Sequence, residues 1–149
     1  MTPALTPLMT LEVLVGAPVQ IDAAPHGRRF IPIVGGTVGG GLTGQVLAGG
    51  GDWQTVWPDG RMDIAAHYVL EIDGQGTVEV RSDGVRHGPP AVLEALARGE
   101  ILDPASYYFR TAVRLRTAAP GLSRLNALLA VATGERAADR VRLRAFELG

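Results

Sequence analysis

Short apolar segments that end in glycine follow one another through the first third of the chain. They occupy residues 11–16, 29–36 and 42–50, and the stretch over residues 35–54 contains nine glycines in twenty positions. Apolar runs of this length, bounded by glycine, are typical of β-strands joined by tight turns. The pattern therefore favours a mainly β fold whose strands bend sharply where no side chain stands in the way.

The rest of the chain continues this pattern with one exception. Further strands are predicted over residues 62–73, 77–82, 107–118, 127–135 and 139–149. The exception is residues 88–100, where two early prolines and Gly99 predict one short helix. About eight to ten strands with one helix cannot form a doubly wound parallel sheet, which leaves a sandwich or a barrel. We expect a closed antiparallel β-barrel, in one domain over residues 1–149, because closure removes the sheet edges.

Glycine motifs that bind phosphate need a different setting from the one found here. Gly39, Gly41 and Gly44 match the G-x-G-x-x-G pattern, and the spacing of Gly39 and Gly44 also matches a phosphate loop. The first motif requires a helix at its end, which residues 45–50 cannot supply before the next glycines. The second requires a lysine and a hydroxyl residue, where this chain has glutamine and valine. The glycines are therefore predicted to serve tight turns and close strand approach.

Missing residue types exclude several classes of function. The sequence has no cysteine, and its fourteen basic residues are all arginine. Disulfides, thiolate nucleophiles, cysteine-bound zinc and lysine Schiff bases are excluded. The fourteen basic residues are dispersed and nearly balance fifteen acidic ones, which argues against nucleic-acid binding. With neither a signal-peptide pattern nor a membrane-spanning apolar run, we expect a cytoplasmic protein.

Two neighbouring strands carry the first candidate site residues. Asp52 and Trp53 follow three glycines, where the carboxylate could move a proton and the indole could stack on a flat ligand. Turn closure and core packing are the alternatives for these two residues. Tyr68 lies on the apolar face of strand 62–73 and could donate to a developing oxyanion, or simply belong to the core. His67 points to the opposite face, so only one of the two can face inward unless a bulge intervenes.

The strand over residues 107–118 carries a further candidate. Arg110 lies among aromatic and apolar residues, and the cost of burying an unpaired guanidinium suggests that it binds an anion. Arg114 and Arg116 share its face, which suggests instead a solvated outer surface or an oligomer contact. Tyr108 is expected at the edge of the cavity. Asn126, beside a glycine turn, is predicted either to contact the ligand or to hold the backbone.

The sequence indicates no metal or cofactor site. His26, His67 and His87 are far apart and show neither His-x-His nor His-x-x-x-His spacing. The serines lack the strand-to-helix setting of a nucleophile elbow. We therefore expect a site that works without a metal or a cofactor.

Several short motifs in a fixed order resemble a known family. They are GGDWQ (50–54), PDG (58–60), HGPP (87–90), YYFRT (107–111) and LN (125–126). From about residue 11 to residue 148 the chain resembles domain of unknown function 3237, also called uncharacterised protein family 0311. The resemblance implies a small antiparallel barrel, homo-oligomeric, with a pocket in its mouth. It also implies a small-molecule ligand and cofactor-free transformation of small, often aromatic, organic molecules.

These observations combine into one expected function and one alternative. We expect an acid–base enzyme of isomerase, lyase or cyclase type, acting on a small aromatic or carbonyl-bearing substrate. Its cavity would be edged by Trp53, Tyr68, Tyr108 and Arg110. Asp52 or His67 would move the proton, while Tyr68 and Arg110 would hold the negative oxygen. The alternative is a non-catalytic binding or carrier protein for a hydrophobic small molecule, and a barrel packed solid would be neither.

Overall fold

The computed structural model describes residues 1–22 and 26–149. Its ten strands are β1 (Leu5–Val15), β2 (Val19–Gln20), β3 (Gly27–Gly39), β4 (Gly44–Val46), β5 (Gly51–Val56), β6 (Met62–Ile72), β7 (Gly76–His87), β8 (Tyr108–Arg116), β9 (Leu129–Arg136) and β10 (Arg140–Leu148). The helical elements are α1 (Pro90–Ala97) and the 3₁₀ helices η1 (Pro104–Ser106) and η2 (Pro120–Ala127).

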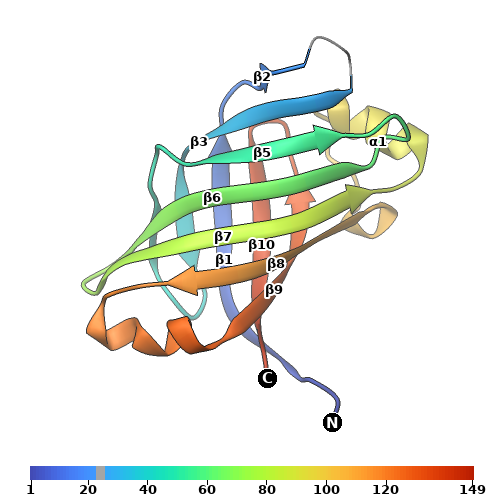
Figure 1. Cartoon of the computed structure of the whole chain (residues 1–149). Helices are drawn as coiled ribbons and strands as arrows, with labels where there is room; N and C mark the ends of the chain where they lie inside the picture. Colours follow the sequence, from blue (N-terminus) through green and yellow to red (C-terminus); the bar gives the residue numbers. More distant parts are fainter. Residues whose placement is uncertain (23–25) are drawn as a thin grey trace.

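The strands form one antiparallel sheet that closes on itself (Figure 1). The order runs β1-β10-β9-β8-β7-β6, then β4 and β5 share the next position, and β3 pairs back to β1. The barrel therefore has eight strand positions, and β2 adds to the outside of β3. The predicted closed antiparallel barrel of about eight to ten strands with one short α-helix is confirmed.

The glycine-rich stretch forms the end of β3, two turns, β4 and the start of β5. Gly36 has φ 142°, and a Cβ there would overlap the carbonyl oxygen of Glu12 on β1. A Cβ on Gly51 would overlap the ring of Phe30 on β3. The prediction of turns and close strand approach fits these positions. One strand is shorter than predicted, since residues 42–50 contain only β4 and a turn in which Gly49 has φ 108°.

Side-chain alternation assigns the two faces of each strand. On β6 the even-numbered residues, including Tyr68 and Leu70, point into the barrel, while His67 is exposed. On β8 the odd-numbered residues are buried and the even-numbered ones, including Arg110, are exposed. Neither strand has a register shift in its pairing with β7, so the two-residue period holds along both.

Helical segments cover the two ends of the barrel. Figure 1 places α1 at one end and η2 at the other. The 3₁₀ helix η2 inserts Leu122 and Leu125 into the hydrophobic core and thereby closes its end. At the other end α1 buries only Ala95 and Leu96 and is followed by Gly99 at φ 83°.

Within residues 1–22 and 26–149, no helix has the length and the apolar content that a membrane-spanning helix needs.

Candidate functional site

The barrel interior changes character from one end to the other. Near η2 the inward side chains are apolar and fully buried, among them Leu70, Ile72, Val78 and Val80. This end is a close-packed hydrocarbon core. Toward α1, inward positions carry hydroxyls, a carboxylate and guanidinium groups among the apolar side chains. The end near η2 is called the closed end below, and the end near α1 the mouth.

Three hydroxyl groups lie in the middle of the interior. Tyr68 is 2% exposed and Ser82 and Thr111 are buried, yet Tyr68 Oη, Ser82 Oγ and Thr111 Oγ1 have no hydrogen-bond partner among the described residues. All three line a void of about 40 Å³ together with Asp52. Buried hydroxyls normally find partners, so a void lined by three unpaired ones is suited to hold a polar ligand atom or water.

Asp52 occupies the junction between this void and the mouth. It lies on β5, and its carboxylate accepts hydrogen bonds from Gln54 Nε2 (2.6 Å) and from the backbone N–H of Ala65 (3.0 Å). Burial raises the pKa of the Asp52 carboxyl above its ordinary value, although these hydrogen bonds and nearby Arg29 oppose the shift. A carboxyl that is easier to protonate than usual is suited to proton transfer.

Three arginines, Arg29, Arg86 and Arg136, converge above Asp52. They come from β3, β7 and β9 and line, with Asp52 and Gln54, a second void of about 30 Å³. Arg86 is the most buried of them, at 9% exposure. Burial lowers the pKa of Arg86 to about 10, and the neighbouring guanidiniums of Arg136 and Arg29 add to this effect. The group therefore stays charged at neutral pH.

The arginines also form the floor of an open depression at the mouth. This vestibule has a volume of about 780 Å³, the size of a small-molecule site. Its walls include Trp57 and Pro58 from the loop after β5, and Leu93 and Leu96 from α1. The three spaces lie in series. The vestibule shares Arg29, Met62, Arg86 and Arg136 with the 30 Å³ void, and that void shares Asp52 with the 40 Å³ void.

The structure brings two of the sequence-predicted residues together in the interior and leaves two of their neighbours outside. Asp52 and Tyr68 both line the 40 Å³ void. Trp53, the next residue on β5, is 46% exposed on the outer face and packs against Phe30, with the ring centroids 4.6 Å apart. His67 is also on the outer face, where Nε2 lies 2.5 Å from Glu79 Oε2.

The remaining predicted residues lie away from the interior voids. Tyr108 is 55% exposed on the outer face of β8, with the guanidinium of Arg110 5.3 Å from its ring centroid. Arg110 Nη1 donates to the Phe109 carbonyl, 2.9 Å away. Asn126, at the closed end, accepts from the Thr117 N–H (2.8 Å) and donates to the Thr117 carbonyl (2.9 Å), so it holds the backbone after β8.

Sequence reasoning missed five of the polar residues that line the interior: Arg29, Arg86, Arg136, Ser82 and Thr111. One signal, the two-residue alternation along each strand, could have found them. On β7, Val78, Val80, Ser82 and Arg86 are all even-numbered and inward, so an alternation pattern extended beyond residue 82 would have marked Arg86 as an unusual interior cation. Arg29 is likewise in phase with buried Ile31 and Ile33 on β3, and Arg136 with buried Ala130 and Ala132 on β9, so the same alternation extends to both arginines.

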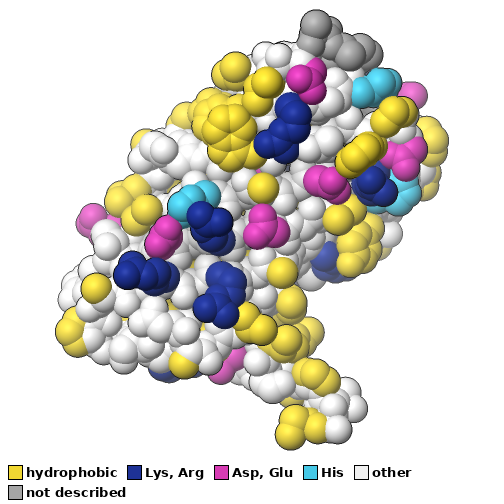
Figure 2. Space-filling view, viewed as in Figure 1, with side chains coloured by type: hydrophobic (Ala, Val, Ile, Leu, Met, Phe, Trp, Pro, Cys, Tyr) yellow, Lys and Arg dark blue, Asp and Glu magenta, His cyan; other side chains and the backbone are white. Residues whose placement is uncertain are grey.

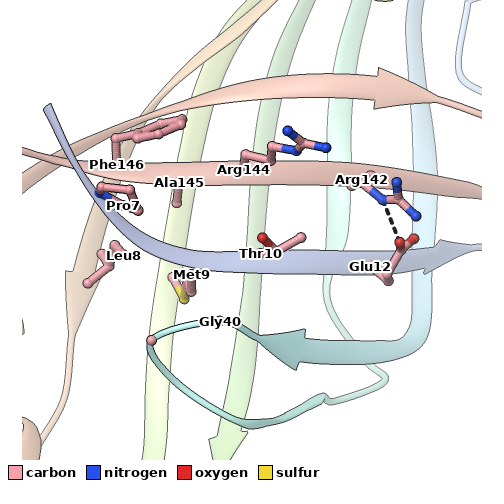
Figure 3. Close-up of a pocket in the computed structure, with 11 residues that line it drawn as sticks. Pro7, Leu8, Met9, Thr10, Glu12, Gly40, Arg142, Arg144, Ala145 and Phe146 are labelled. Atoms are coloured by element: carbon pink, nitrogen blue, oxygen red, sulfur yellow. Dashed lines mark hydrogen bonds and ion pairs between the residues drawn. The ribbon is translucent and has the colours of Figure 1, made fainter.

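Two further depressions lie outside the barrel. One, of about 460 Å³, follows β1 and β10 and contains the ion pair between Glu12 and Arg142 (Figure 3). The other, of about 550 Å³, crosses β7 and β8 and includes Arg81, Arg114 and Arg116. Figure 2 shows basic, acidic and histidine side chains mixed on one outer face of the molecule. Neither depression shares a lining residue with the two interior voids or with the vestibule, so both are separate from the mouth.

No group of three or more His, Asp or Glu side chains that could hold a metal ion occurs in the described part of the chain.

Comparison with known proteins gives consistent matches over nearly the whole chain. The model of the family described as "Protein of unknown function (DUF3237)" matches residues 3–148. A UPF0311 protein of Bradyrhizobium diazoefficiens is 40% identical over 144 residues, which is 95% of both chains. The crystal structure of a conserved protein of unknown function from Rhodopseudomonas palustris has a TM-score of 0.93 at 35% identity, covering 100% of this chain and 99% of that one.

A more distant structure shares the fold. It is described as an enzyme from Penicillium herquei and has a TM-score of 0.75 at 18% identity, covering 100% of this chain and 96% of that chain. At this identity the likeness shows the barrel alone. The family model and the 40% identical relative show more, and on them the chain belongs to the DUF3237 family, which is also called UPF0311.

Proposed function

We propose that the chain binds a small carbonyl-bearing organic molecule in the mouth of the barrel and transfers a proton to or from it with its own side chains. The reaction would be of isomerase, lyase or cyclase type. The observation that carries this proposal is the position of Asp52. Its carboxyl, whose pKa is raised, lines the 30 Å³ void that adjoins the open vestibule. The three arginine guanidinium groups line the void on the vestibule side of Asp52, and the three unpaired hydroxyl groups line the 40 Å³ void on its other side.

The side chains that line the two inner voids have separate roles in this chemistry. Asp52 takes a proton from a carbon next to the carbonyl group and returns it to another atom. The carbonyl oxygen gains negative charge in that step, and the Tyr68 hydroxyl or the Arg86 guanidinium stabilises it by donating a hydrogen bond. Arg86 thus replaces Arg110, which the sequence suggested for this role, because Arg110 lies on the outer face.

The size of the spaces supports a reaction at one end of the substrate. The two inner voids, of about 30 and 40 Å³, have room for only a few atoms each. The vestibule, at about 780 Å³, has room for the body of the molecule. A flat or apolar body would contact Trp57 and Leu93 there while its polar end reaches Asp52.

Proton exchange on a model compound tests the proposal. Phenylpyruvate carries exchangeable hydrogens beside a carbonyl group, and their replacement by deuterium in D₂O is followed by ¹H NMR. We expect the protein to accelerate this exchange above the buffer rate, and Asp52→Asn to lower the protein-dependent rate about 100-fold or more. Asp83→Asn makes the same chemical change on the outer face of β7 and should keep the rate. Exchange that is not accelerated, or that persists in Asp52→Asn, contradicts the proposal.

One observation favours the second candidate, a non-catalytic binding protein. Both carboxylate oxygens of Asp52 already accept hydrogen bonds, from Gln54 and from the Ala65 N–H. A carboxylate held in this way can serve as a fixed counter-charge that positions arginines, without moving a proton. In that case the model compound would bind in the mouth but exchange its hydrogens only at the buffer rate.

A further inference from the structure

Positive charge exceeds negative charge at the floor of the vestibule. The 30 Å³ void is lined by Arg29, Arg86 and Arg136 against one carboxylate, Asp52, so the formal charge there is +2. Asp59 and Glu94 line the outer vestibule but not this inner void. A group of buried like charges is unfavourable unless something of opposite charge joins it.

The three arginines lack the carboxylate partners that five other arginines in the described part of the chain have. Among the described residues, the ion pairs of arginine involve Arg61, Arg98, Arg124, Arg140 and Arg142. Arg29 instead donates from Nε to Gln54 Oε1 (2.7 Å), a neutral amide. Arg136 Nη1 reaches only the carbonyl of Arg140, at 3.5 Å. None of the three is paired with a carboxylate of the described residues.

Arg86 is the clearest case of an unpaired cation. It is 9% exposed, and its Nε has no hydrogen-bond partner among the described residues. Its side chain points into the space that joins the vestibule to Asp52, because it lines both. Burial, and after it the charge of Arg136, also lowers the pKa of Arg29, so like charge acts on more than one of the three arginines.

We propose that the ligand is an organic carboxylate that enters carboxylate first, with this group held between Arg29, Arg86 and Arg136 and the apolar body in the vestibule. The inference rests on the proposed function in that it names the substrate class of the same site. Guanidinium groups match the planar, two-oxygen shape of a carboxylate. An apolar body suits walls that include Trp57, Met62 and Leu93.

The size of the inner void favours a carboxylate over a phosphate. A carboxylate is smaller than a phosphate group with its four oxygens, and it therefore suits a void of about 30 Å³ better. One carboxylate, together with Asp52, would leave the site at +1, and a dicarboxylate would neutralise it. Phosphate monoesters present the same kind of acceptor oxygens, so the experiment includes one.

Matched probes test the inference on the full chain. Benzoate and benzamide have the same ring and nearly the same shape but differ in charge, and phenyl phosphate presents the alternative anion. Binding is measured by titrating each probe into ¹⁵N-labelled protein and following the backbone and arginine Nε signals. We expect benzoate to bind at least about tenfold more tightly than benzamide and to shift the Nε signal of Arg86.

Variants assign the effect to the arginines. Arg86→Met should weaken benzoate binding about tenfold or more and weaken benzamide binding much less, and Arg136→Met should act in the same direction. Arg114→Met removes an exposed arginine on the outer face of β8 and should change neither. Thermal unfolding of each variant verifies that it is folded, and the comparison of probes on the unaltered protein does not depend on any variant.

The possible results separate this inference from the proposed function. Benzamide binding as tightly as benzoate, no saturable binding of benzoate, or tighter binding of phenyl phosphate would each overturn the carboxylate assignment. Benzoate has no hydrogen that Asp52 could remove, so its binding does not depend on proton transfer. Benzoate binding without exchange of phenylpyruvate would therefore refute the proposed enzyme and leave the carboxylate site standing.

Discussion

The two ends of the barrel belong to one sheet but carry different kinds of inward side chain. At the closed end, inward positions carry Leu70, Val78 and Val80, all fully buried, and η2 seals them from solvent. At the mouth, inward positions of β3, β7 and β9 carry arginines, and α1 leaves an open vestibule. Folding alone would favour hydrocarbon at both ends. The difference is what we would expect if the closed end maintains the fold and the mouth binds the ligand that we propose.

Strand β7 shows the contrast within one element. Its inward residues run from Val78 and Val80 through Ser82 to Arg86, from hydrocarbon to hydroxyl to charge. Such a gradient along one face cannot come from strand propensity, because all positions have the same backbone geometry. It corresponds to depth in the barrel, and the following predictions test whether the two ends respond differently to substitution.

The largest effect is expected at the closed end. Leu70→Ala leaves a cavity in a core where Leu70 is fully buried, and we expect the free energy of unfolding to fall by about 2–5 kcal/mol. Urea unfolding followed by circular dichroism measures it. Leu129→Ala, at an exposed leucine, should cost far less. Equal losses for the two variants would show that the closed end is not the stabilising core.

A smaller effect of opposite sign is expected at the mouth. Arg86→Met replaces a buried, unpaired cation with an apolar side chain of similar length, and we expect the free energy of unfolding to stay level or to rise by about 1–4 kcal/mol. The same urea experiment, without added ligand, measures it. A large loss of stability would instead identify Arg86 as a structural residue and would weaken the comparison between the two ends.

The pH dependence of stability probes Asp52. Its pKa is raised above 3.8 in the folded protein, so just above that pH the folded chain holds a proton that the unfolded chain has released. The free energy of unfolding contributed by Asp52 therefore falls as pH rises through this window. Asp52→Asn should lose this slope, and Asp83→Asn should keep it, in urea unfolding measured at a series of pH values. A contribution that rises with pH would mean that the arginines lower the pKa of Asp52 instead.

The smallest effect on stability is expected in the middle of the barrel. Tyr68→Phe removes a hydroxyl that has no partner among the described residues, so the free energy of unfolding should change by no more than about 1 kcal/mol. The same variant should slow the exchange of phenylpyruvate if the phenol stabilises the developing negative oxygen. Unchanged exchange would remove Tyr68 from the proposed mechanism and leave Asp52 and the arginines.

Much of the fold could be predicted because it depends on local patterns. Glycine-bounded apolar runs predicted the strands, and the single helix was expected over residues 88–100 and lies at Pro90–Ala97. Within the site, Asp52 and Tyr68 could be predicted because each is a polar side chain next to glycines or on an apolar strand face. Arg110 stood out in the same way but lies outside, on the exposed face of β8 that it shares with Arg114 and Arg116, as in the alternative of an outer surface.

The sequence by itself determined a mainly β chain with alternating strand faces and glycine turns, because these properties depend on residues close together along the chain. Only the tertiary structure decided that Arg29, Asp52, Arg86 and Arg136 meet at one mouth. They come from β3, β5, β7 and β9, and closure of the sheet brings them together. The physical reason is that the charge of a site is the sum of the charges of side chains that are neighbours in space. Here those side chains come from four strands, so no single strand reveals it.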